Sequence, residues 1–198
     1  NLDRPKWIPG EDYHHAPTCA TCHMSATRTQ QVTHDIGMRI SWNNRPVLSI
    51  RPEVSDAKMG LPGKDVPWEV RRLNMQDVCM SCHNKVWVEN FYVQYDGLID
   101  LYNEKYAKPG QELYALAKPL LNPIQFTNKM DFTWFELWHH EGRRARHGAS
   151  MMGPDYTHWH GTYELARNFY AEYIPELKEL VEEGLHSEDS IKVQAASR

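Results

Sequence analysis

Two short stretches, Cys19-Ala-Thr-Cys22-His23 and Cys79-Met-Ser-Cys82-His83, decide how this sequence folds and what it binds. They contain all four cysteines of the 198 residues. A CxxC pair serves as a zinc clamp, as a redox dithiol or, when His follows directly, as a haem attachment site. With 11 His in the chain, His would follow both pairs by chance on the order of 0.3% of the time. Two covalently attached c-type haems are therefore predicted.

The other two readings of a CxxC pair fit the sequence less well. Zinc sites built from two pairs place them about 12–20 residues apart, whereas these pairs are much farther apart in the sequence. A redox dithiol belongs in a βαβ setting, and no strand pattern is evident here. In the haem reading, Cys19, Cys22, Cys79 and Cys82 form thioethers, and His23 and His83 are the proximal iron ligands.

Composition excludes several classes of function. The formal net charge of -4 does not indicate a basic surface that would bind nucleic acid. No apolar run approaches the ~20 residues of a membrane helix, so we expect a chain without a membrane span. No leader segment is recognised at Asn1, so any signal peptide is expected to have been removed or to lie far upstream. Haem is attached in this way outside the cytoplasm, which predicts an extracytoplasmic location, the periplasm or its equivalent.

The rest of the sequence predicts an all-α fold with long C-terminal helices and extended haem-wrapping loops. Residues 1–86 are expected to form a haem-binding region and residues 87–198 a helical region. Pro- and Gly-rich residues 43–68 predict a long loop. Apolar residues at helical spacing predict further helices, over 87–106, ended by Pro109-Gly110, then over 113–121, over 131–147, ended by Gly148, and over 156–184, with Pro175 as a kink or new start.

Two local features complete this prediction. The turn Gly153-Pro154-Asp155 is expected to cap the last long helix with Asp155, and the polar tail 187–198 is expected to fray.

Distal iron ligands are expected among the remaining histidines, although a single His is more often a surface or hydrogen-bonding residue. His34 lies in a short polar loop after the first motif. His147 ends a helix beside Gly148, which would let a flat macrocycle approach the backbone. His140 lies two helical turns before His147 on the same face, and His139 is its rival.

The arrangement resembles the C-terminal third of the octahaem hydroxylamine oxidoreductase family, which includes the hydrazine dehydrogenases and has the pentahaem nitrite reductases as distant kin. Beside the haem motifs, the matching stretches are Thr33-His34-Asp35, Ser41-Trp42, Arg146-His147-Gly148 and Pro154-Asp155-Tyr156-Thr157. The resemblance implies that these are the last two of eight haems, with His34 and His147 as distal ligands. It also implies a homotrimer, a redox partner cytochrome and further haem-bearing portions or subunits of the same enzyme.

The resemblance also assigns a catalytic role to Tyr156. In oxidising members the matching tyrosine is bonded to the catalytic haem of a neighbouring subunit, and the turn before Tyr156 should direct its ring outward. Two departures limit the match. The chain has two haem motifs where the family has eight, and Asn44-Arg45-Pro46 stands where the ammonia oxidisers place a tyrosine.

The substrate therefore stays open between hydroxylamine, hydrazine and nitrite. The resemblance implies part of an oxidoreductase that oxidises a small nitrogen compound, hydroxylamine or hydrazine, with these two haems relaying the electrons. A stand-alone dihaem electron carrier and a nitrite-reducing family member are the alternatives.

Overall fold

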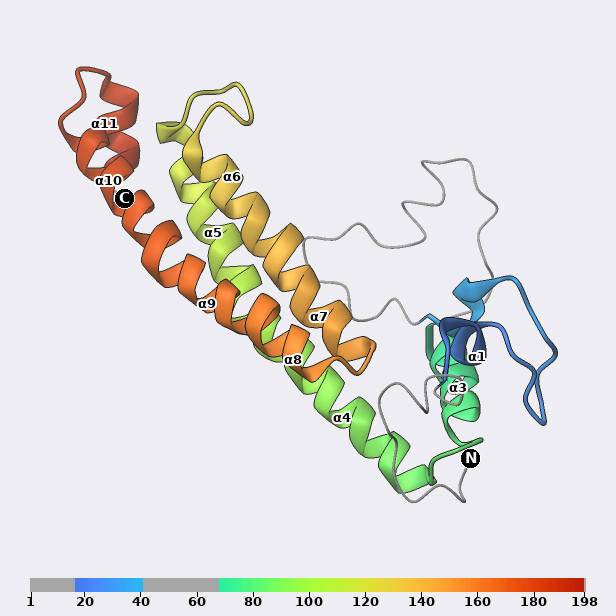
Figure 1. Ribbon diagram of the computed structural model, residues 1–198. Coiled ribbons are helices and arrows are strands. Elements are labelled where there is room, and N and C mark those ends of the chain that lie inside the picture. Colours follow the sequence, from blue (N-terminus) through green and yellow to red (C-terminus); the bar gives the residue numbers. More distant parts are fainter. Residues whose placement is uncertain (1–16, 41–67, 198) are drawn as a thin grey trace. The chain divides into compact units, whose positions relative to one another are not determined.

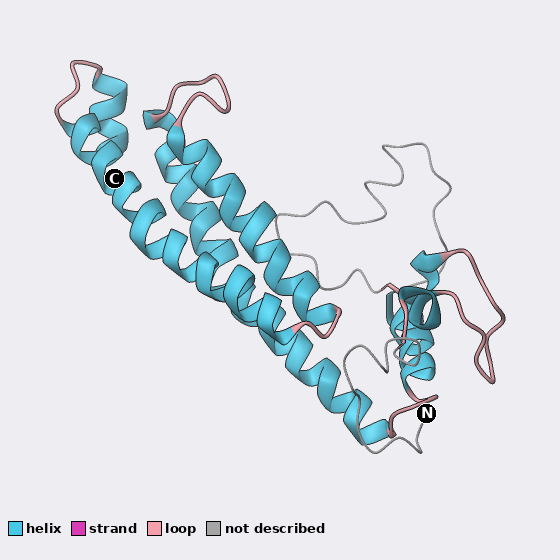
Figure 2. Ribbon diagram, in the orientation of Figure 1, coloured by secondary structure: helices cyan, strands magenta, loops and turns pink. Residues whose placement is uncertain are grey.

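The computed structural model describes residues 17–40 and 68–197, and these are helical and contain no strand (Figure 2). This confirms the all-α prediction. The loop expected over 43–68 lies almost entirely outside the described residues. The described chain divides into two compact units, unit 1 up to Gln94 and unit 2 from Tyr95 onward. No helix in the described ranges is long and apolar enough to cross a membrane.

Unit 1 contains both haem motifs. Helix α1 (Cys19–His23) and the short 3₁₀ helix η2 (Ile36–Arg39) both pack against α3 (Trp68–Cys79), as Figure 1 shows for α1 and α3. Thr18 caps α1 by accepting a hydrogen bond from the Thr21 N–H at 3.3 Å. Helix α4 (Lys85–Tyr102) begins in this unit, and its residues from Tyr95 onward belong to unit 2.

Unit 2 is built from three long helical segments that pack side by side (Figure 1). The first runs through the end of α4, the π-helical turn η3 (Asn103–Ala107), α5 (Lys108–Ala117) and η4 (Lys118–Leu120). The second comprises α6 (Lys129–Phe135), η5 (Glu136–Glu141) and α7 (Gly142–Ser150). The third comprises α8 (Pro154–Tyr156), η6 (Thr157–Tyr163), α9 (Glu164–Asn168), η7 (Phe169–Tyr173) and α10 (Ile174–Leu185).

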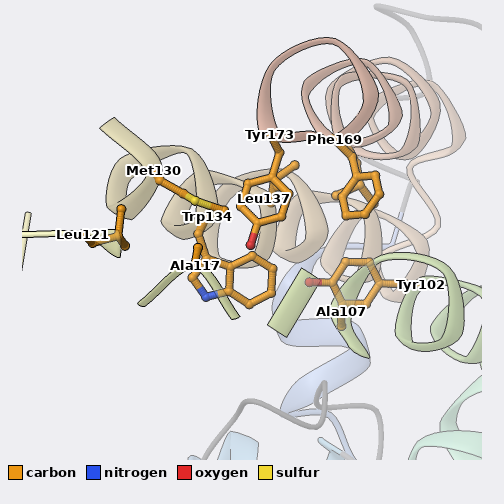
Figure 3. Close-up of a cluster of buried hydrophobic side chains, with 10 residues drawn as sticks. Tyr102, Ala107, Ala117, Leu121, Met130, Trp134, Leu137, Phe169 and Tyr173 are labelled. Atoms are coloured by element: carbon orange, nitrogen blue, oxygen red, sulfur yellow. The ribbon is translucent and has the colours of Figure 1, made fainter. Parts of the chain in front are cut away.

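Large aromatic side chains fill the core between these segments (Figure 3). Tyr173 is fully buried, and its hydroxyl donates a hydrogen bond of 2.7 Å to the carbonyl of Gly110. A side chain at position 110 would collide with the Trp134 ring, since a Cβ there would lie 2.3 Å from it. The glycine therefore lets the first and second segments approach closely, and burial of the rings stabilises their packing.

The helix boundary expected at Pro109-Gly110 is wrong, because the first segment continues through both residues. Pro109 lies two residues beyond the π-helical turn η3, and Pro175 lies two residues beyond η7. A proline lacks an N–H and clashes with the carbonyl four residues before it. A π-helical turn just upstream shifts the pairing of N–H and carbonyl groups along the helix. The proline ring is thereby accommodated without ending the helix.

Three further boundaries also differ from the sequence prediction. The second segment continues past Gly148 to Ser150, and the residue that caps α8 is Gly153, not Asp155. The tail is not frayed, because Ser190–Ala196 form α11, which packs on α10 and η4. Its start is fixed by Asp189, whose carboxylate accepts a hydrogen bond of 2.8 Å from the Ile191 N–H.

Candidate haem sites

Each CxxCH motif of unit 1 forms one helical turn. In α1 the two cysteines and His23 are three and four residues apart, so their side chains share one face of the turn. The second motif begins at the last residue of α3 and forms a turn beyond it, in which the N–H groups of Cys82 and His83 donate to the Cys79 carbonyl at 3.1 and 2.9 Å. Both motifs thus present two thiols and one imidazole to the same side, as attachment of a haem c requires.

The thiols are available for attachment, and those of the two motifs lie near each other. Cys19 and Cys82 are exposed, Cys22 and Cys79 are half-buried, and none of the four forms a disulfide. The pKa of Cys22 is raised by burial and then by the nearby thiols of Cys19 and Cys82. The pKa of Cys79 is raised by burial and then by Cys22. The fold thus brings together two motifs that are far apart in the sequence.

Apolar side chains around the motifs stay exposed in this unit. Val86 is 65% exposed and Leu73 is 61% exposed. The other members of this group are Val32, Ile36, Met80 and Trp87. Exposed apolar side chains in the unit that carries both attachment motifs call for a cover. A haem macrocycle has the flat, apolar shape to provide one, so the residues present fit the group.

Around the first motif, a buried arginine organises the backbone. Arg39 is only 2% exposed. Its Nη1 donates a hydrogen bond of 3.0 Å to the Cys22 carbonyl, and its Nη2 donates to the Ser25 carbonyl. The pKa of His23 is lowered by burial and then by the Arg39 charge. The imidazole is consequently held neutral, the form that binds iron.

The second motif has an aromatic neighbour. The rings of His83 and Trp87 stack with centroids 3.9 Å apart and planes inclined by 13°. Trp87 is held at the start of α4, since its backbone N–H donates a hydrogen bond of 2.9 Å to Asn84 Oδ1. The Phe91 ring continues the stack beyond Trp87, with centroids 6.3 Å apart. Within the described residues, no cluster of three or more His, Cys, Asp or Glu side chains could share a metal ion.

The predicted distal ligands lie in different units. His34 is exposed in the loop just before η2 of unit 1, whereas His140 in η5 and His147 in α7 are exposed in unit 2. The pKa of His147 is lowered by partial loss of hydration and by Arg143 and Arg146. Their assignment as iron ligands stays a prediction.

His139, the rival of His140, is engaged within its own helix. Its ring stacks on Phe135 with centroids 4.4 Å apart, and its Nε2 lies 3.3 Å from Arg143 Nη1. His140 makes only edge contacts with the rings of Phe135 and His139. Of the two, His140 is the one whose ring is more accessible.

The space beside Gly148 is taken by the chain itself. A Cβ at this position would lie 2.5 Å from Thr157 Oγ1 and 3.2 Å from the Tyr156 ring. The glycine therefore serves the tight packing of α7 on α8 and η6, and the expectation that it admits a macrocycle is corrected. Tyr156 follows at the end of α8, 48% exposed, with its ring 5.6 Å from that of His160.

Sequence reasoning missed Arg39 and Trp87, and also Gln30 and Asp77, where Gln30 is hydrogen-bonded to both Arg39 and Asp77. Trp87 had a detectable signal, because it lies four residues after His83 at the start of a predicted helix. The other three carried none, since they are ordinary polar residues whose partners lie far away in the sequence.

Residues 9–118, which include both motifs, match a family model described as a seven-times multihaem cytochrome CxxCH. The chain belongs to this multihaem cytochrome family. It is a haem protein of electron transfer that binds haem c covalently, and cytochromes of this class are generally extracytoplasmic. Searches of curated proteins and of solved structures gave no significant match.

Proposed function

We propose that this cytochrome is the electron-relay portion of a multihaem enzyme that oxidises hydroxylamine or hydrazine in the periplasm. In this proposal the two motifs of unit 1 carry the relay haems, and Tyr156 is cross-linked to the catalytic haem of a neighbouring subunit in a homotrimer. The observation that carries it is the position of Tyr156, which is 48% exposed at the end of α8. A tyrosine buried in its own chain could not reach such a partner.

The surroundings of Tyr156 support a covered surface. Trp159, Tyr163 and Tyr170 follow it along the third segment of unit 2 and are 54%, 52% and 62% exposed. Aromatic side chains exposed in a row are a liability unless another molecule covers them. A subunit that receives Tyr156 would cover part of this row, and a redox partner cytochrome would take up the electrons elsewhere.

The haem, when bound, supplies one-electron exchange at its iron. The chain attaches it through the two cysteine pairs and orients it through His23 and His83. His34 and His147, with His140 as a further candidate, are proposed to complete the axial ligation. Arg39 holds the backbone of the first motif, and Trp87 holds the ring of His83.

The substitution Tyr156→Phe in the complete enzyme tests this function. It should abolish oxidation of hydroxylamine and hydrazine, because Phe lacks the hydroxyl and cannot reproduce the chemistry of the linked ring. The spectra of the two haems in this chain should stay unchanged. Tyr163→Phe is the matched control, since Tyr163 is equally exposed on the same segment and should retain activity. Retained oxidation in Tyr156→Phe would contradict the proposal.

A stand-alone dihaem electron carrier is the second candidate. The observation in its favour is that both motifs lie together in one small unit. A carrier would lack substrate oxidation altogether and would contain no cross-linked Tyr156. A nitrite-reducing member would instead consume electrons, so an assay with a reduced dye and nitrite separates it from both.

A further inference from the structure

Two charged side chains of unit 1 are joined by a single amide. Gln30 accepts a hydrogen bond of 3.2 Å from Arg39 Nε through its carbonyl oxygen. Its amide nitrogen donates to the Asp77 carboxylate at 2.8 Å and to the Asn74 carbonyl at 2.8 Å. The guanidinium and the carboxylate therefore bind the oxygen and the nitrogen of one side-chain amide, within the part of the fold that holds both motifs.

Arg39 contacts the first motif, whereas Asp77 precedes the second motif in the sequence. Arg39 donates to the carbonyls of Cys22, within the first motif, and of Ser25, just after it. Asp77 lies in the last turn of α3, two residues before Cys79, where the second motif begins. The order of the charges thus follows the order of the motifs, positive at the first and negative beside the second.

Both charges are held in place. Arg39 is almost completely buried. The carboxylate of Asp77 also accepts hydrogen bonds from the hydroxyls of Thr27 and Thr29, the latter at 2.8 Å. These donors lower the pKa of Asp77, Thr27 most and then Gln30 and Thr29, so it stays ionised at neutral pH.

Fixed charges next to a haem alter its reduction potential. An oxidised haem iron carries one more positive charge than the reduced iron, and charges act strongly where water is excluded. We propose that Arg39 raises the potential of the haem at Cys19–His23, that Asp77 lowers the potential of the haem at Cys79–His83, and that the pair makes the two haems inequivalent. Electrons then rest on the first haem in preference to the second.

The inference deepens the cytochrome's electron transfer and is independent of the substrate. The test is a potentiometric titration of the haem-loaded protein followed by electron paramagnetic resonance. Variants with both cysteines of one motif changed to serine assign each signal to its haem. Arg39→Gln should shift the potential of the first haem downward, and Asp77→Asn should shift that of the second haem upward.

Opposite shifts distinguish electrostatics from damage to the network. A merely structural role would move the potentials in the same direction in both variants, and this result would overturn the proposal. Arg28→Gln removes one positive charge from an exposed position of the same segment, and it should leave both potentials nearly unchanged. A shift as large as that of Arg39→Gln would also overturn the proposal.

Arg39→Lys separates charge from hydrogen bonding. It keeps the positive charge and should keep the potential of the first haem close to that of the parent, whereas an equal drop in Arg39→Lys and Arg39→Gln would contradict the proposal. If Arg39→Gln does not yield folded protein, Asp77→Asn and Arg39→Lys decide the question alone. Absence of haem from the parent protein would instead contradict the cytochrome assignment, so the two failures are distinguishable.

Discussion

The two CxxCH motifs each form one turn but have different neighbours. Beside the first, the buried Arg39 binds the carbonyls of Cys22 and Ser25, and His23 is half-buried. At the second, His83 is exposed and stacks on Trp87. The motif determines how a haem is attached, whereas the neighbouring residues determine its reduction potential, because this potential depends on burial and nearby charge. Two haems on similar turns are thus expected to be inequivalent.

The largest expected effect comes from removing a distal ligand. His147→Ala should leave one haem five-coordinate and high-spin, with both haems still attached, because attachment depends on the cysteines and not on this bond. His34→Ala should do the same to the other haem, which would assign one distal ligand to each motif. Electron paramagnetic resonance and absorption spectra report the change.

The control for these variants is His186→Ala, at the end of α10, where the ring contacts the Glu182 carbonyl at 2.8 Å. It should leave both haems low-spin. A fully low-spin spectrum for His147→Ala would show that His147 is not a ligand, and His140 would then be the residue to change.

An intermediate effect is expected from Gln30→Leu. The substitution leaves Arg39 Nε and the Asp77 carboxylate without their shared partner, and an unsatisfied buried polar group costs about 1–3 kcal/mol. The free energy of unfolding, measured by denaturant titration of the haem-loaded protein, should fall by that amount. Gln31→Leu, at an exposed neighbouring position, should change it little. Equal losses in the two variants would mean that the network contributes nothing specific to unit 1.

The smallest effect is expected from Trp87→Leu. Loss of the stack should free the His83 ring to rotate, which alters the electron paramagnetic resonance signal of the second haem and leaves that of the first unchanged. Trp87→Phe keeps an aromatic face and should restore the parent signal. If the Leu and Phe variants gave the same signal as the parent, the stack would have no part in orienting the ligand.

Local spacing made much of this molecule predictable. The CxxCH spacing predicted the attachment cysteines and the proximal histidines, and apolar periodicity predicted the long helices of unit 2. Spacing failed where the backbone departs from 3.6 residues per turn. Pro109 was expected to end a helix, yet η3 widens the preceding turn and the helix continues. Similarly, the tail looked too polar to pack, but Gly184 lets α11 approach, since a Cβ there would lie 2.9 Å from Ala196 and Leu120.

The candidate site was predictable only in part. The attachment cysteines and proximal histidines follow from the motif itself. Arg39, Gln30 and Asp77 could not be found from the sequence, because they meet only when η2 and α1 pack on α3. The role of Tyr156 was implied by the family resemblance alone, and its side chain is exposed in the fold. Its proposed partner haem belongs to another subunit.

Mass spectrometry of a digest of the denatured protein tests the assignment of two haem c groups most directly, since denaturation removes every haem that is not covalently bound. The peptides that contain Cys19–His23 and Cys79–His83 should each carry the mass of one haem, whether or not Tyr156 is cross-linked. The double variant Cys79→Ser, Cys82→Ser should carry one haem fewer, and Cys19→Ser, Cys22→Ser should likewise lose one. A parent protein with no covalent haem, or with only one, would contradict the account.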